Sequence, residues 1–379
     1  MFIKSIELKN YRNYKDLKLE FSKEKILLIG KNAQGKTNLL ESLYYLSCLN
    51  TPRAKNDSEL ICWDEQITKL KAVIQKDDIE KELEILINPP KRKELKVNGI
   101  KKGKSAEFCI NLSVVAFSVN DLLLLRGVPD DRRSWLDMAI SQIYPAYPDR
   151  LAKYNKIRIQ KNNHLKEIKG NINADTSLLE VFNTQMSISG SNIIFLRLKF
   201  LKELQKIAME KHLQIAPNEI LTTFYNSTVL GDIVFSTEDI MPVEEIAQVF
   251  EKRLKEKQLE EIIRAQALVG PHRDDVSFFI NGAEAKKFAS QGQQRTVVLS
   301  LKLAELELIK EKINDTPVLL LDDVLAELDD IRQNYLLNAI GENTQTIITS
   351  VDTLHFDEEY LKDVEIFKIT EGKLASYIG

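Results

Sequence analysis

Eight consecutive residues near the N-terminus, GKNAQGKT at positions 30–37, match the pattern G-x-x-x-x-G-K-[ST] of phosphate-binding loops. Glycines at both ends let backbone N–H groups turn toward an anion, and a helix that starts directly afterwards adds the positive end of its dipole. In this pattern Lys36 contacts the β- and γ-phosphates, and the hydroxyl of Thr37 coordinates Mg²⁺. The alternative is a plain strand-to-helix turn. The spacing favours a site for ATP and Mg²⁺ formed by Gly30, Lys31, Asn32, Ala33, Gln34, Gly35, Lys36, Thr37 and Asn38.

A second segment carries acids at the end of an apolar run. Residues 318–321 (VLLL) are followed by Asp322 and Asp323, which is the Walker B arrangement of nucleotide hydrolases. Such a run is common by itself, but together with a phosphate-binding loop it can hold a magnesium–nucleotide complex. We expect Asp322 to coordinate Mg²⁺ and Asp323 to polarise the attacking water, so that Lys36, Asp322 and Asp323 form the catalytic set. The alternative for Asp323 is a solvated turn acid.

A third segment, SQGQQR at 290–295, directly precedes a stretch with helical spacing. It resembles the signature sequence of ABC ATPases, in which a helix start offers a hydroxyl and N–H groups to the γ-phosphate held by the opposite subunit. By this resemblance Ser290, Gly292 and Gln293 contact nucleotide, and ATP joins two copies of the chain. The alternative is an ordinary helix capped by Ser290. Residues 326–329 (AELD) resemble the D-loop of the same class.

The strands expected around these motifs are short and bounded by turns. Apolar and polar residues alternate at 17–21, 70–74 and 83–87, which is the period-two pattern of half-buried strands. Residues 25–29 (KILLI) are typical of a strand covered on both faces. Asn98-Gly99 and Asn281-Gly282 are expected to turn hairpins, because Asn-Gly tolerates the positive φ angles of a type I′ turn. Further strands are expected at 276–280, 318–321 and 346–349.

The middle of the chain is expected to be mainly helical. Residues 132–144, 178–214 and 243–268 carry apolar side chains at helical spacing and few helix breakers, and another helix is expected from residue 295 to about 310. One α/β domain interrupted by a helical insertion explains this order most simply. We therefore expect residues 1–118 and 266–379 to form an α/β head, lobe I, and residues 119–265 to form a helical lobe II.

Several segments together resemble the RecF family of bacterial DNA replication and repair ATPases. They occur in the order of the family along essentially the whole chain, as LKNYRNY (8–14), the loop at 30–37, FSVNDL (117–122), RGVPDDRRSWLD (126–137), GPHRDD (270–275), SQGQQR (290–295) and LLDDVLAELD (320–329). Val119, Trp135 and Ala326 depart from the usual family residues, and none of them is a phosphate-contacting position. The resemblance implies an ABC-ATPase, SMC-like head with a P-loop core and an antiparallel β subdomain, plus the inserted helical lobe.

The same resemblance implies what the chain does. Members of this family form ATP-dependent homodimers that clamp duplex and gapped DNA, help RecO and RecR to load RecA at single-strand gaps, and reset by slow, DNA-stimulated ATP hydrolysis. Arg12 resembles an arginine that contacts the nucleotide phosphates in SMC-like heads, with a surface arginine as the alternative. The switch histidine of ABC transporters has no counterpart, since Thr349 and Ser350 stand there. The alternative function is an SMC-like ATPase that regulates a protein partner without binding DNA.

Composition alone does not indicate DNA binding. The chain has 53 Lys and Arg residues against 56 Asp and Glu residues, a formal net charge of -3, so any DNA site requires local segregation of basic side chains. Two segments, 91–104 and 153–161, concentrate basic side chains in this way, and the alternative for each is a solvated surface. Neither is accompanied by a motif that reads base edges. The candidate DNA-contacting residues are Lys91, Arg92, Lys93, Lys101, Lys102, Lys104, Lys153, Lys156, Arg158 and Lys161.

Cysteine spacing and hydropathy bear on the compartment. Cys48, Cys62 and Cys109 show no metal-site or disulfide pattern, which fits a reducing compartment. The N-terminal residues lack the apolar run of a secretion signal, and no segment approaches the roughly 20 apolar residues of a membrane span. We therefore expect a cytoplasmic protein without a membrane partner.

Overall fold

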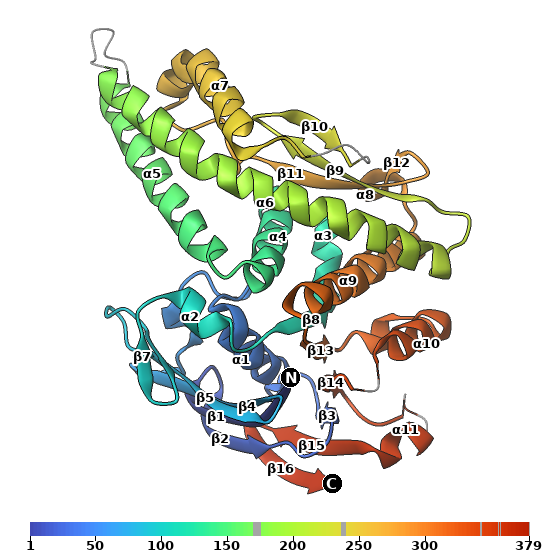
Figure 1. Cartoon of the computed structure of the whole chain (residues 1–379). Coiled ribbons are helices and arrows are strands. Elements are labelled where there is room, and N and C mark those ends of the chain that lie inside the picture. Colours follow the sequence, from blue (N-terminus) through green and yellow to red (C-terminus); the bar gives the residue numbers. More distant parts are fainter. Residues whose placement is uncertain (170–175, 236–239, 342, 355, 357, 379) are drawn as a thin grey trace. The chain divides into compact units, whose positions relative to one another are not determined.

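The computed structural model describes residues 1–169, 176–235, 240–341, 343–354, 356 and 358–378 (Figure 1). The chain divides into two compact units. Unit 1 contains Met1–Asp121 and Glu305–Gly379, and unit 2 contains Leu122–Ala304. Unit 2 is longer than the expected lobe II, because residues 266–304 pack with it rather than with the head. The cause is the pairing of two strands that are far apart in the sequence. β11 (Asp275–Ile280) pairs with β9 (Leu221–Ser227) in antiparallel orientation along its whole length.

Unit 1 contains a mainly parallel sheet with the strand order β16-β15-β3-β14-β13-β8. All neighbouring pairs are parallel except β15 with the edge strand β16. The strands are β3 (Lys25–Ile29), β8 (Val114–Ser118), β13 (Val318–Asp322), β14 (Thr346–Ser350), β15 (Val364–Thr370) and β16 (Lys373–Ile378). Ile26, Leu27 and Leu28 of β3 are fully buried, as the apolar run at 25–29 predicted. Because parallel strands end at the same edge, the chain segments after β3, β13 and β14 meet there.

A second sheet of unit 1 is antiparallel, with the order β2-β1-β4-β5-β6-β7. The strands are β1 (Phe2–Tyr11), β2 (Tyr14–Glu20), β4 (Thr68–Lys76), β5 (Ile79–Ile87), β6 (Glu94–Val97) and β7 (Ile100–Lys102). The predicted alternation is confirmed, since Leu17 and Leu19 are buried between exposed neighbours. The predicted turn between β6 and β7 is confirmed as well, with φ angles of 51° at Asn98 and 75° at Gly99.

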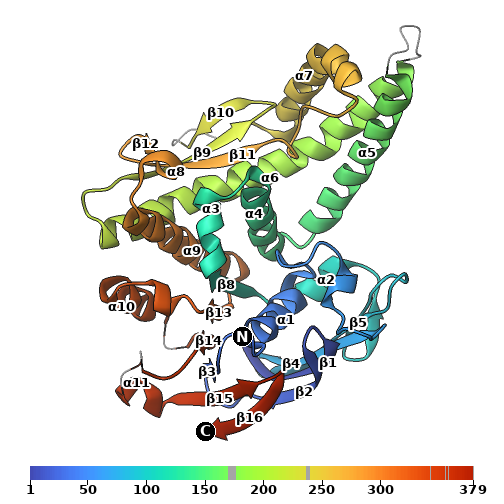
Figure 2. The ribbon, with the colours of Figure 1, turned by 180° about the vertical axis from the view of Figure 1, so that it is seen from behind.

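Helix α1 (Lys36–Cys48) connects the two sheets of unit 1, and both views show it between them (Figures 1 and 2). Leu39, Leu43 and Leu46 point into a core that includes side chains of both sheets, and their spacing is that of one helix face. Burying these side chains fixes the start of α1 next to the end of β3. The other helical segments of unit 1 are α2 (Ser105–Cys109), α10 (Asp330–Ala339), α11 (Glu358–Lys362), and the 3-10 turns η1 (Asp57–Leu60), η2 (Val119–Leu122) and η3 (Leu325–Glu327).

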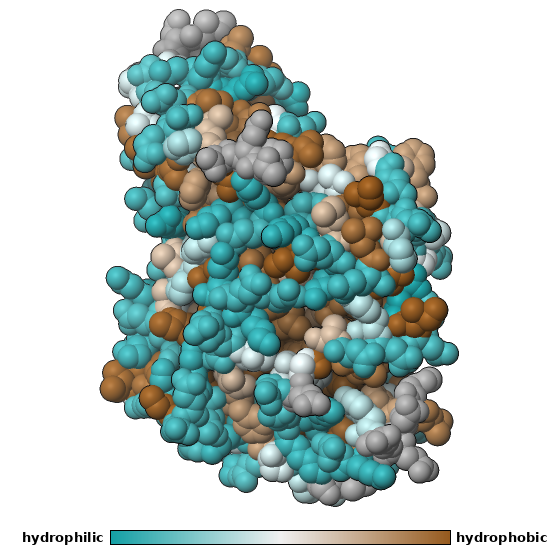
Figure 3. Space-filling view, turned by 45° about the vertical axis from the view of Figure 1, so that its right-hand side comes forward, coloured by the Kyte–Doolittle hydropathy of each residue, from teal (hydrophilic) through white to brown (hydrophobic). Residues whose placement is uncertain are grey.

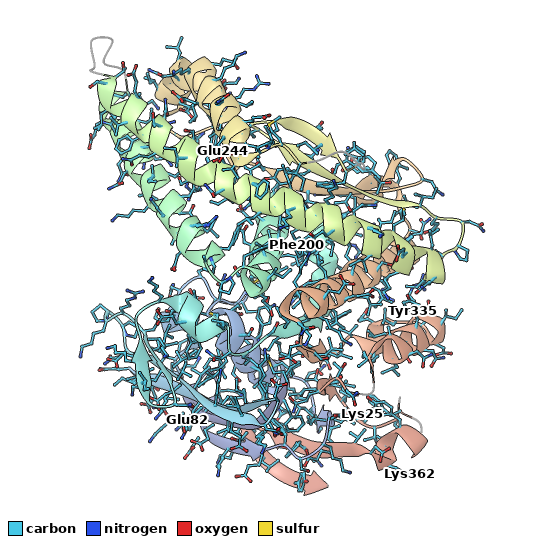
Figure 4. All side chains as sticks on the ribbon, viewed as in Figure 1. Lys25, Glu82, Phe200, Glu244, Tyr335 and Lys362 are labelled. Carbon is cyan, nitrogen blue, oxygen red and sulfur yellow. The ribbon has the colours of Figure 1, made fainter. Side chains whose placement is uncertain are left out.

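Unit 2 is built around α6 (Ser177–Ile215), a helix of 39 residues that packs against α5 and α7. Trp135 of α4 lies between Phe200 of α6, labelled in Figure 4, and Phe278 of β11, with ring centroids 6.4 and 6.3 Å apart in edge-to-face geometry. These aromatic contacts join the helices to the sheet of this unit. The other helices that begin in unit 2 are α3 (Leu123–Arg126), α4 (Pro129–Ile143), α5 (Tyr147–Ile168), α7 (Val243–Arg264), α8 (Ala285–Phe288) and α9 (Gln291–Ile313), and α9 ends in unit 1.

The sheet of unit 2 has the order β10-β9-β11-β12. β10 (Gly231–Val234) and β12 (Ala283–Glu284) are its edges, and Asn281 and Gly282 turn β11 into β12 with positive φ angles, as predicted. β9 and β10 were not expected within the helical insertion. Residues 221–227 (LTTFYNS) contain Thr, Phe and Tyr, which favour strands. They do not alternate apolar with polar residues, since Thr223 and Ser227 are on the buried side of β9.

Hydrophilic side chains cover most of the face drawn in Figure 3, with hydrophobic side chains in small separate patches among them. Of the helices in the described parts of the chain, none is both long enough and apolar enough to cross a membrane. Even α6 carries Arg197, Lys199 and Lys202 within one stretch of its length.

Candidate nucleotide site

The loop between β3 and α1 has the conformation that its glycines predict. Gly30 has φ 157°, and a Cβ atom there would lie 2.4 Å from the carbonyl oxygen of Ile369. Gly35 has φ 114°, and a Cβ atom there would lie 2.6 Å from the side-chain amide of Asn13. Neither position has room for a side chain, so both glycines are required for this loop shape.

Helix α1 begins at the end of this loop with its backbone donors uncapped. Gly35 is the N-cap residue and supplies no side-chain hydrogen bond to the first turn. The first N–H groups of a helix have no acceptor within the helix, so they can donate to a phosphate. The Nζ atom of Lys36 donates to the carbonyl oxygens of Gly30 at 2.6 Å and of Lys31 at 3.1 Å, which holds the amine over the loop.

Two side chains from the start of the chain brace the loop. The amide of Asn13 donates to the carbonyl oxygen of Gln34 at 3.2 Å, and the hydroxyl of Tyr14 donates to the carbonyl oxygen of Gly35 at 2.9 Å. From the other side, the backbone N–H of Glu371 donates to the Oε1 atom of Gln34 at 2.7 Å. These contacts were not expected from the sequence, although Asn13 and Tyr14 belong to the segment LKNYRNY that resembles the family.

The acidic residues after β13 lie against Thr37 and Thr349. The hydroxyl of Thr37 donates to the Oδ1 atom of Asp322 at 2.9 Å. The hydroxyl of Thr349 lies 3.0 Å from the same oxygen and 3.3 Å from Oδ1 of Asp323, and it accepts the backbone N–H of Asp323 at 2.9 Å. Asp322 and Thr349 face each other because β13 and β14 pair in parallel in that register. A role for Thr349 was not expected from the sequence, because its position beside Asp322 depends on this strand pairing.

The oxygen atoms of Thr37 and Asp322 suit a magnesium ion. Mg²⁺ prefers oxygen ligands and is usually held by one or two protein side chains together with substrate phosphates and water. The described residues contain no cluster of three or more His, Cys, Asp or Glu side chains that could hold a metal ion. The pair Thr37 and Asp322 therefore fits a metal that takes its remaining ligands from the nucleotide and from water.

The charge of Asp322 is unfavourable without a cation. Burial raises the pKa of Asp322, and the neighbouring Asp323 acts in the same direction, against the hydrogen bonds from Thr37 and Thr349. A carboxyl group with a higher pKa in the folded state makes folding less favourable at pH values where it is ionised in the unfolded state. This cost is absent at low pH, where the group is protonated in both states.

We expect Asp322→Asn to raise the Tm of the nucleotide-free protein at neutral pH, and the gain over wild type to shrink as the pH falls toward about 4, near the ordinary pKa of Asp. Thermal unfolding at a series of pH values measures this. Asp330→Asn is the matched control, because Asp330 is exposed on α10. A lower Tm for Asp322→Asn than for wild type at neutral pH would contradict the prediction.

Arg12 is bound to a buried acid in this structure. Its Nε and Nη2 atoms donate to the two carboxylate oxygens of Glu41 at 2.9 and 2.7 Å, and its Nη1 atom donates to the carbonyl oxygen of Glu59 at 2.8 Å. Glu41 lies on α1, its side chain is 2% exposed, and it also accepts the hydroxyl of Thr51 at 2.8 Å. Arg12 thus ties α1 to the segment after it. Its contact with nucleotide phosphates stays a prediction.

A hollow of about 840 Å³ opens beside the first turn of α1. Its walls include Asn38, Arg53 and Trp63, and the side chain of Trp63 is 89% exposed. The volume is in the range of small-molecule sites, and such sites commonly have aromatic side chains in their walls. The hollow is therefore large enough for the nucleoside part of a nucleotide whose phosphates lie at the loop.

The segment that resembles the ABC signature starts helix α9 in unit 2. The backbone N–H of Ser290 donates to Oε1 of Gln293 at 2.8 Å, and the N–H of Gln293 donates to Oγ of Ser290 at 3.2 Å, a reciprocal capping box. The side-chain amide of Gln293 donates to Glu219 at 2.9 Å. Ser290, Gly292 and Gln293 thus lie at a helix start, and their contact with nucleotide stays a prediction.

The basic residues of the β6–β7 hairpin differ in availability. The Nζ atom of Lys93 lies 3.2 Å from Asp57 and donates to the hydroxyl of Tyr45 at 2.8 Å. Lys101 is 3.5 Å from Glu94. Within the described parts of the chain, the remaining candidates have no ion-pair partner, and these are Lys91, Arg92, Lys102 and Lys104.

Helix α5 exposes two of its four candidate cations. Lys153 and Lys156 are exposed, Arg158 is half-buried, and Lys161 is buried. The expectation of a DNA contact is wrong for Lys161, because its Nζ atom lies 2.6 Å from Glu261 of α7 and both side chains are only 1% exposed. Lys161 lies on the buried face of α5 together with Tyr154, Ile157 and Leu165.

Lys161→Met is expected to lower the free energy of unfolding by about 3–5 kcal/mol, because it leaves the carboxylate of Glu261 buried without its cation. Adding Glu261→Gln should recover most of the lost stability. In the wild-type protein Glu261 accepts the backbone N–H of Leu268 at 2.8 Å, and an amide oxygen can still accept it. Urea unfolding measures both effects. Lys156→Met, on the exposed face of the same helix, is the control. A loss of equal size in that control would contradict the special role of the buried pair.

Comparison with known proteins gives the family. The family described as RecF/RecN/SMC N terminal domain matches residues 2–373. The DNA replication and repair protein RecF of Bacillus cereus (strain G9842) is 41% identical over 373 residues, which cover 98% of each chain. RecF of Bacillus thuringiensis (strain Al Hakam) is 40% identical over the same length and coverage.

Solved structures of similar proteins agree with this result. Two structures of the recombination mediator protein RecF in the RecFOR pathway, described as RecF-ATPrS and RecF-ATP, match with TM-scores of 0.89 and 0.88 at 33% identity. Each match covers 100% of this chain and 98% of the other. The SmcHead bound to the C-winged helix domain of ScpA matches with a TM-score of 0.53 at 14% identity over 98% of this chain and 96% of the other, which shows a shared fold.

Proposed function

The chain belongs to the RecF family of DNA replication and repair proteins, with an SMC-like ATPase fold, and on this basis we propose that it is an ATP-gated DNA-binding protein of recombinational repair. The observation that carries the proposal is the assembly of the nucleotide site. A loop with both required glycines and Lys36 lies beside Thr37 and Asp322, whose side-chain oxygens are 2.9 Å apart. This arrangement supports the binding of a magnesium–nucleotide complex.

Each residue of the site has a distinct role in the proposed reaction. The loop N–H groups and Lys36 bind the phosphates of ATP, and Thr37 and Asp322 hold the metal. The magnesium ion, when bound, neutralises charge on the β- and γ-phosphates. Asp323 accepts a hydrogen bond from the attacking water and orients it. Because an aspartate is shorter than the glutamate usual in ABC-type ATPases, we expect slow hydrolysis, which suits a timer.

The remaining part of the proposal concerns assembly. Ser290, Gly292 and Gln293 of one copy contact the γ-phosphate held by a second copy, so that ATP joins a homodimer. The closed dimer binds duplex and gapped DNA, DNA stimulates hydrolysis, and hydrolysis opens the dimer. In the cytoplasm the protein then helps RecO and RecR to load RecA at single-strand gaps. The relatives described as RecF-ATP and as members of the RecFOR pathway support this reading.

DNA binding in different nucleotide states tests the proposal. The experiment is fluorescence anisotropy of a labelled gapped duplex titrated with the protein in ATP, in ADP and without nucleotide, at one fixed moderate salt concentration, since affinity for DNA depends strongly on salt. We expect tight binding in ATP alone. Equal and weak binding in all three states would contradict the proposal and favour an ATPase that acts on a protein partner.

Trp63 is expected to report nucleotide binding. The nucleoside of a bound ATP extends from the loop into the hollow lined by Asn38, Arg53 and Trp63. The exposed indole of Trp63 would therefore lie next to it. The chain has two tryptophans, and Trp135 is buried at 5% exposure. Titration with ATP should therefore change tryptophan emission in wild type. Trp63→Phe should remove this change while ATP affinity, measured by calorimetry, is retained. An unchanged signal in Trp63→Phe would exclude the hollow as the nucleoside site.

A further inference from the structure

Arg158 of α5 is a half-buried cation without a partner among the residues that the structure describes. Its Nε atom is sealed from solvent and has no hydrogen-bond acceptor, and among the described residues no carboxylate or carbonyl group bonds to its guanidinium. Buried polar groups in native proteins nearly always have a partner, and leaving a charged donor unpaired is costly. The other two guanidinium nitrogens of Arg158 are not sealed, so an anion from outside the chain could reach them and balance the charge of the group.

The position of Arg158 follows from its neighbours on the same helix face. Tyr154, Arg158 and Asn162 are spaced four residues apart, so their side chains lie on one face of α5. The hydroxyl of Tyr154 lies 2.7 Å from Nδ1 of His272, and the side-chain oxygen of Asn162 accepts the backbone N–H of Ala267 at 2.7 Å. Arg158 lies between these two contacts and therefore faces the segment from Ala267 to His272.

A second arginine reaches the same segment. Arg273 is exposed, its Nε atom donates to the carbonyl oxygen of Ala267 at 3.3 Å, and its Nη2 atom donates to the side-chain oxygen of Gln266 at 2.9 Å. Both acceptors are neutral, so the charge of Arg273, like that of Arg158, is not matched by an acid of the described chain.

The acids near this segment already have partners. Asp274 is buried and accepts hydrogen bonds from Tyr225 at 2.7 Å and from Thr228 at 2.7 and 2.8 Å. Asp275 is paired with Arg132 at 2.7 Å. A third arginine, Arg133, is paired with Asp130 and donates to the carbonyl oxygen of Asp274 at 2.7 Å. Among the described residues around this segment, the positive charges of Arg158 and Arg273 therefore remain unmatched by an acid.

The imidazole of His272 lies within the electric field of these arginines. Burial, and then the charges of Arg158, Arg273 and Arg133, lower the pKa of His272 to about 3, against the hydrogen bond to Ala267. The neutral ring can accept the hydroxyl of Tyr154 at Nδ1 and donate from Nε2 to the carbonyl oxygen of Ala267 at 3.2 Å. His272 is therefore a neutral ring held by two hydrogen bonds, and the positive charge of this segment near neutral pH comes from Arg158 and Arg273.

We propose that Arg158 and Arg273 form a binding site for a phosphate group of the DNA backbone. The inference rests on the proposed function, which makes DNA the ligand. A guanidinium group offers paired donors that match phosphate oxygens, and phosphate contacts of this kind carry no base sequence information. A bound phosphate would give the two guanidinium nitrogens beside the sealed Nε of Arg158 an anionic acceptor, and it would balance the charge of the group. Free phosphate has the same chemistry, so the test separates the two sources.

The test compares Arg158→Gln and Arg273→Gln with wild type in ATP, by anisotropy of a labelled duplex over a range of salt concentrations. The expected result is a loss of affinity of about tenfold for each variant, and a slope of log affinity against log salt that is smaller by about one unit per lost contact. Arg253→Gln is the matched control, because Arg253 is 50% exposed on α7 and paired with Glu256. The control should keep wild-type affinity and slope.

The outcomes separate the inference from the proposed function. Wild type that binds no DNA in any nucleotide state overturns both. Wild type that binds DNA in ATP, together with two variants of unchanged affinity and salt slope, overturns the phosphate site alone. In a parallel experiment, the Tm of wild type and of both variants is measured at increasing concentrations of inorganic phosphate, with ATP at saturation. Stabilisation of wild type but not of the variants, with DNA binding unchanged, assigns the site to free phosphate and overturns the DNA contact. Arg273→Gln changes an exposed side chain, so it carries the test even where Arg158→Gln alters folding.

Discussion

Lys36→Ala is expected to abolish ATP binding, with a loss of affinity of at least about 100-fold, or about 3 kcal/mol. Lys36 is 4% exposed, and the carbonyl oxygens of Gly30 and Lys31 already hold its amine over the loop at 2.6 and 3.1 Å. Exchanging these neutral acceptors for anionic phosphate oxygens makes both partners of each hydrogen bond charged, which strengthens the bond. Without the amine, the negative charge of the β- and γ-phosphates loses its nearest cation from the chain.

Calorimetric titration with ATP and sedimentation in ATP measure this effect. The proposed function has ATP join two copies of the chain, so the variant should remain monomeric in ATP while wild type is expected to dimerise. Lys31→Ala is the matched control, because Lys31 lies in the same loop with an exposed side chain and contributes its backbone carbonyl oxygen to the site. Lys36→Met retains most of the apolar stem and separates loss of charge from loss of packing. ATP-dependent dimerisation of Lys36→Ala would contradict the role assigned to the loop.

The nucleotide site could be predicted because its determinants are local in sequence. The glycines at 30 and 35, the lysine and threonine that follow, and the apolar runs at 25–29 and 318–321 each fix a short piece of backbone. Parallel pairing then places the ends of β3 and β13 at one edge of the sheet. No long-range information is needed to expect Lys36, Thr37 and Asp322 near one another, once a single sheet is assumed.

The features that were missed depend on contacts remote in sequence. Residues 266–304 pack with unit 2 because β11 pairs with β9, a choice of partner that periodicity does not specify. The carboxylate of Glu261 lies 100 residues beyond its partner Lys161. A run of charged residues on a helix therefore cannot be divided into surface and buried cations by composition, although the helical positions of Tyr154, Ile157 and Leu165 mark the buried face.

Thr349 shows the same limit within the site. Its hydroxyl contacts Asp322 and the backbone N–H of Asp323 only because β14 lies in register beside β13. In the sequence it appears as the place where an expected histidine is absent. The structure makes it a positioning residue for both acids, since one hydroxyl lies within 3.3 Å of each carboxylate.

Asp323→Asn is expected to stop hydrolysis while ATP binding and the ATP-bound dimer are kept. Asp323 has φ 54°, its N–H donates to Thr349 at 2.9 Å, and its carboxylate faces the same hydroxyl at 3.3 Å. Asparagine has the same shape and tolerates this left-handed backbone conformation, so the local structure should be retained. The amide carries no negative charge to polarise the attacking water, and loss of a group that acts on the proton of the nucleophile lowers rates by about 10²–10⁴-fold.

The expected result is therefore a dimer that forms in ATP and does not dissociate, in contrast to Lys36→Ala, which never forms one. Phosphate release and sedimentation on the same samples measure both properties, and DNA bound to the variant should be released only when ATP is removed. Asp330→Asn, at an exposed acid of α10, controls for the loss of one negative charge near the site. Hydrolysis at the wild-type rate would remove Asp323 from the catalytic set. Ready dissociation of the variant in ATP would instead show that hydrolysis does not control the opening of the dimer.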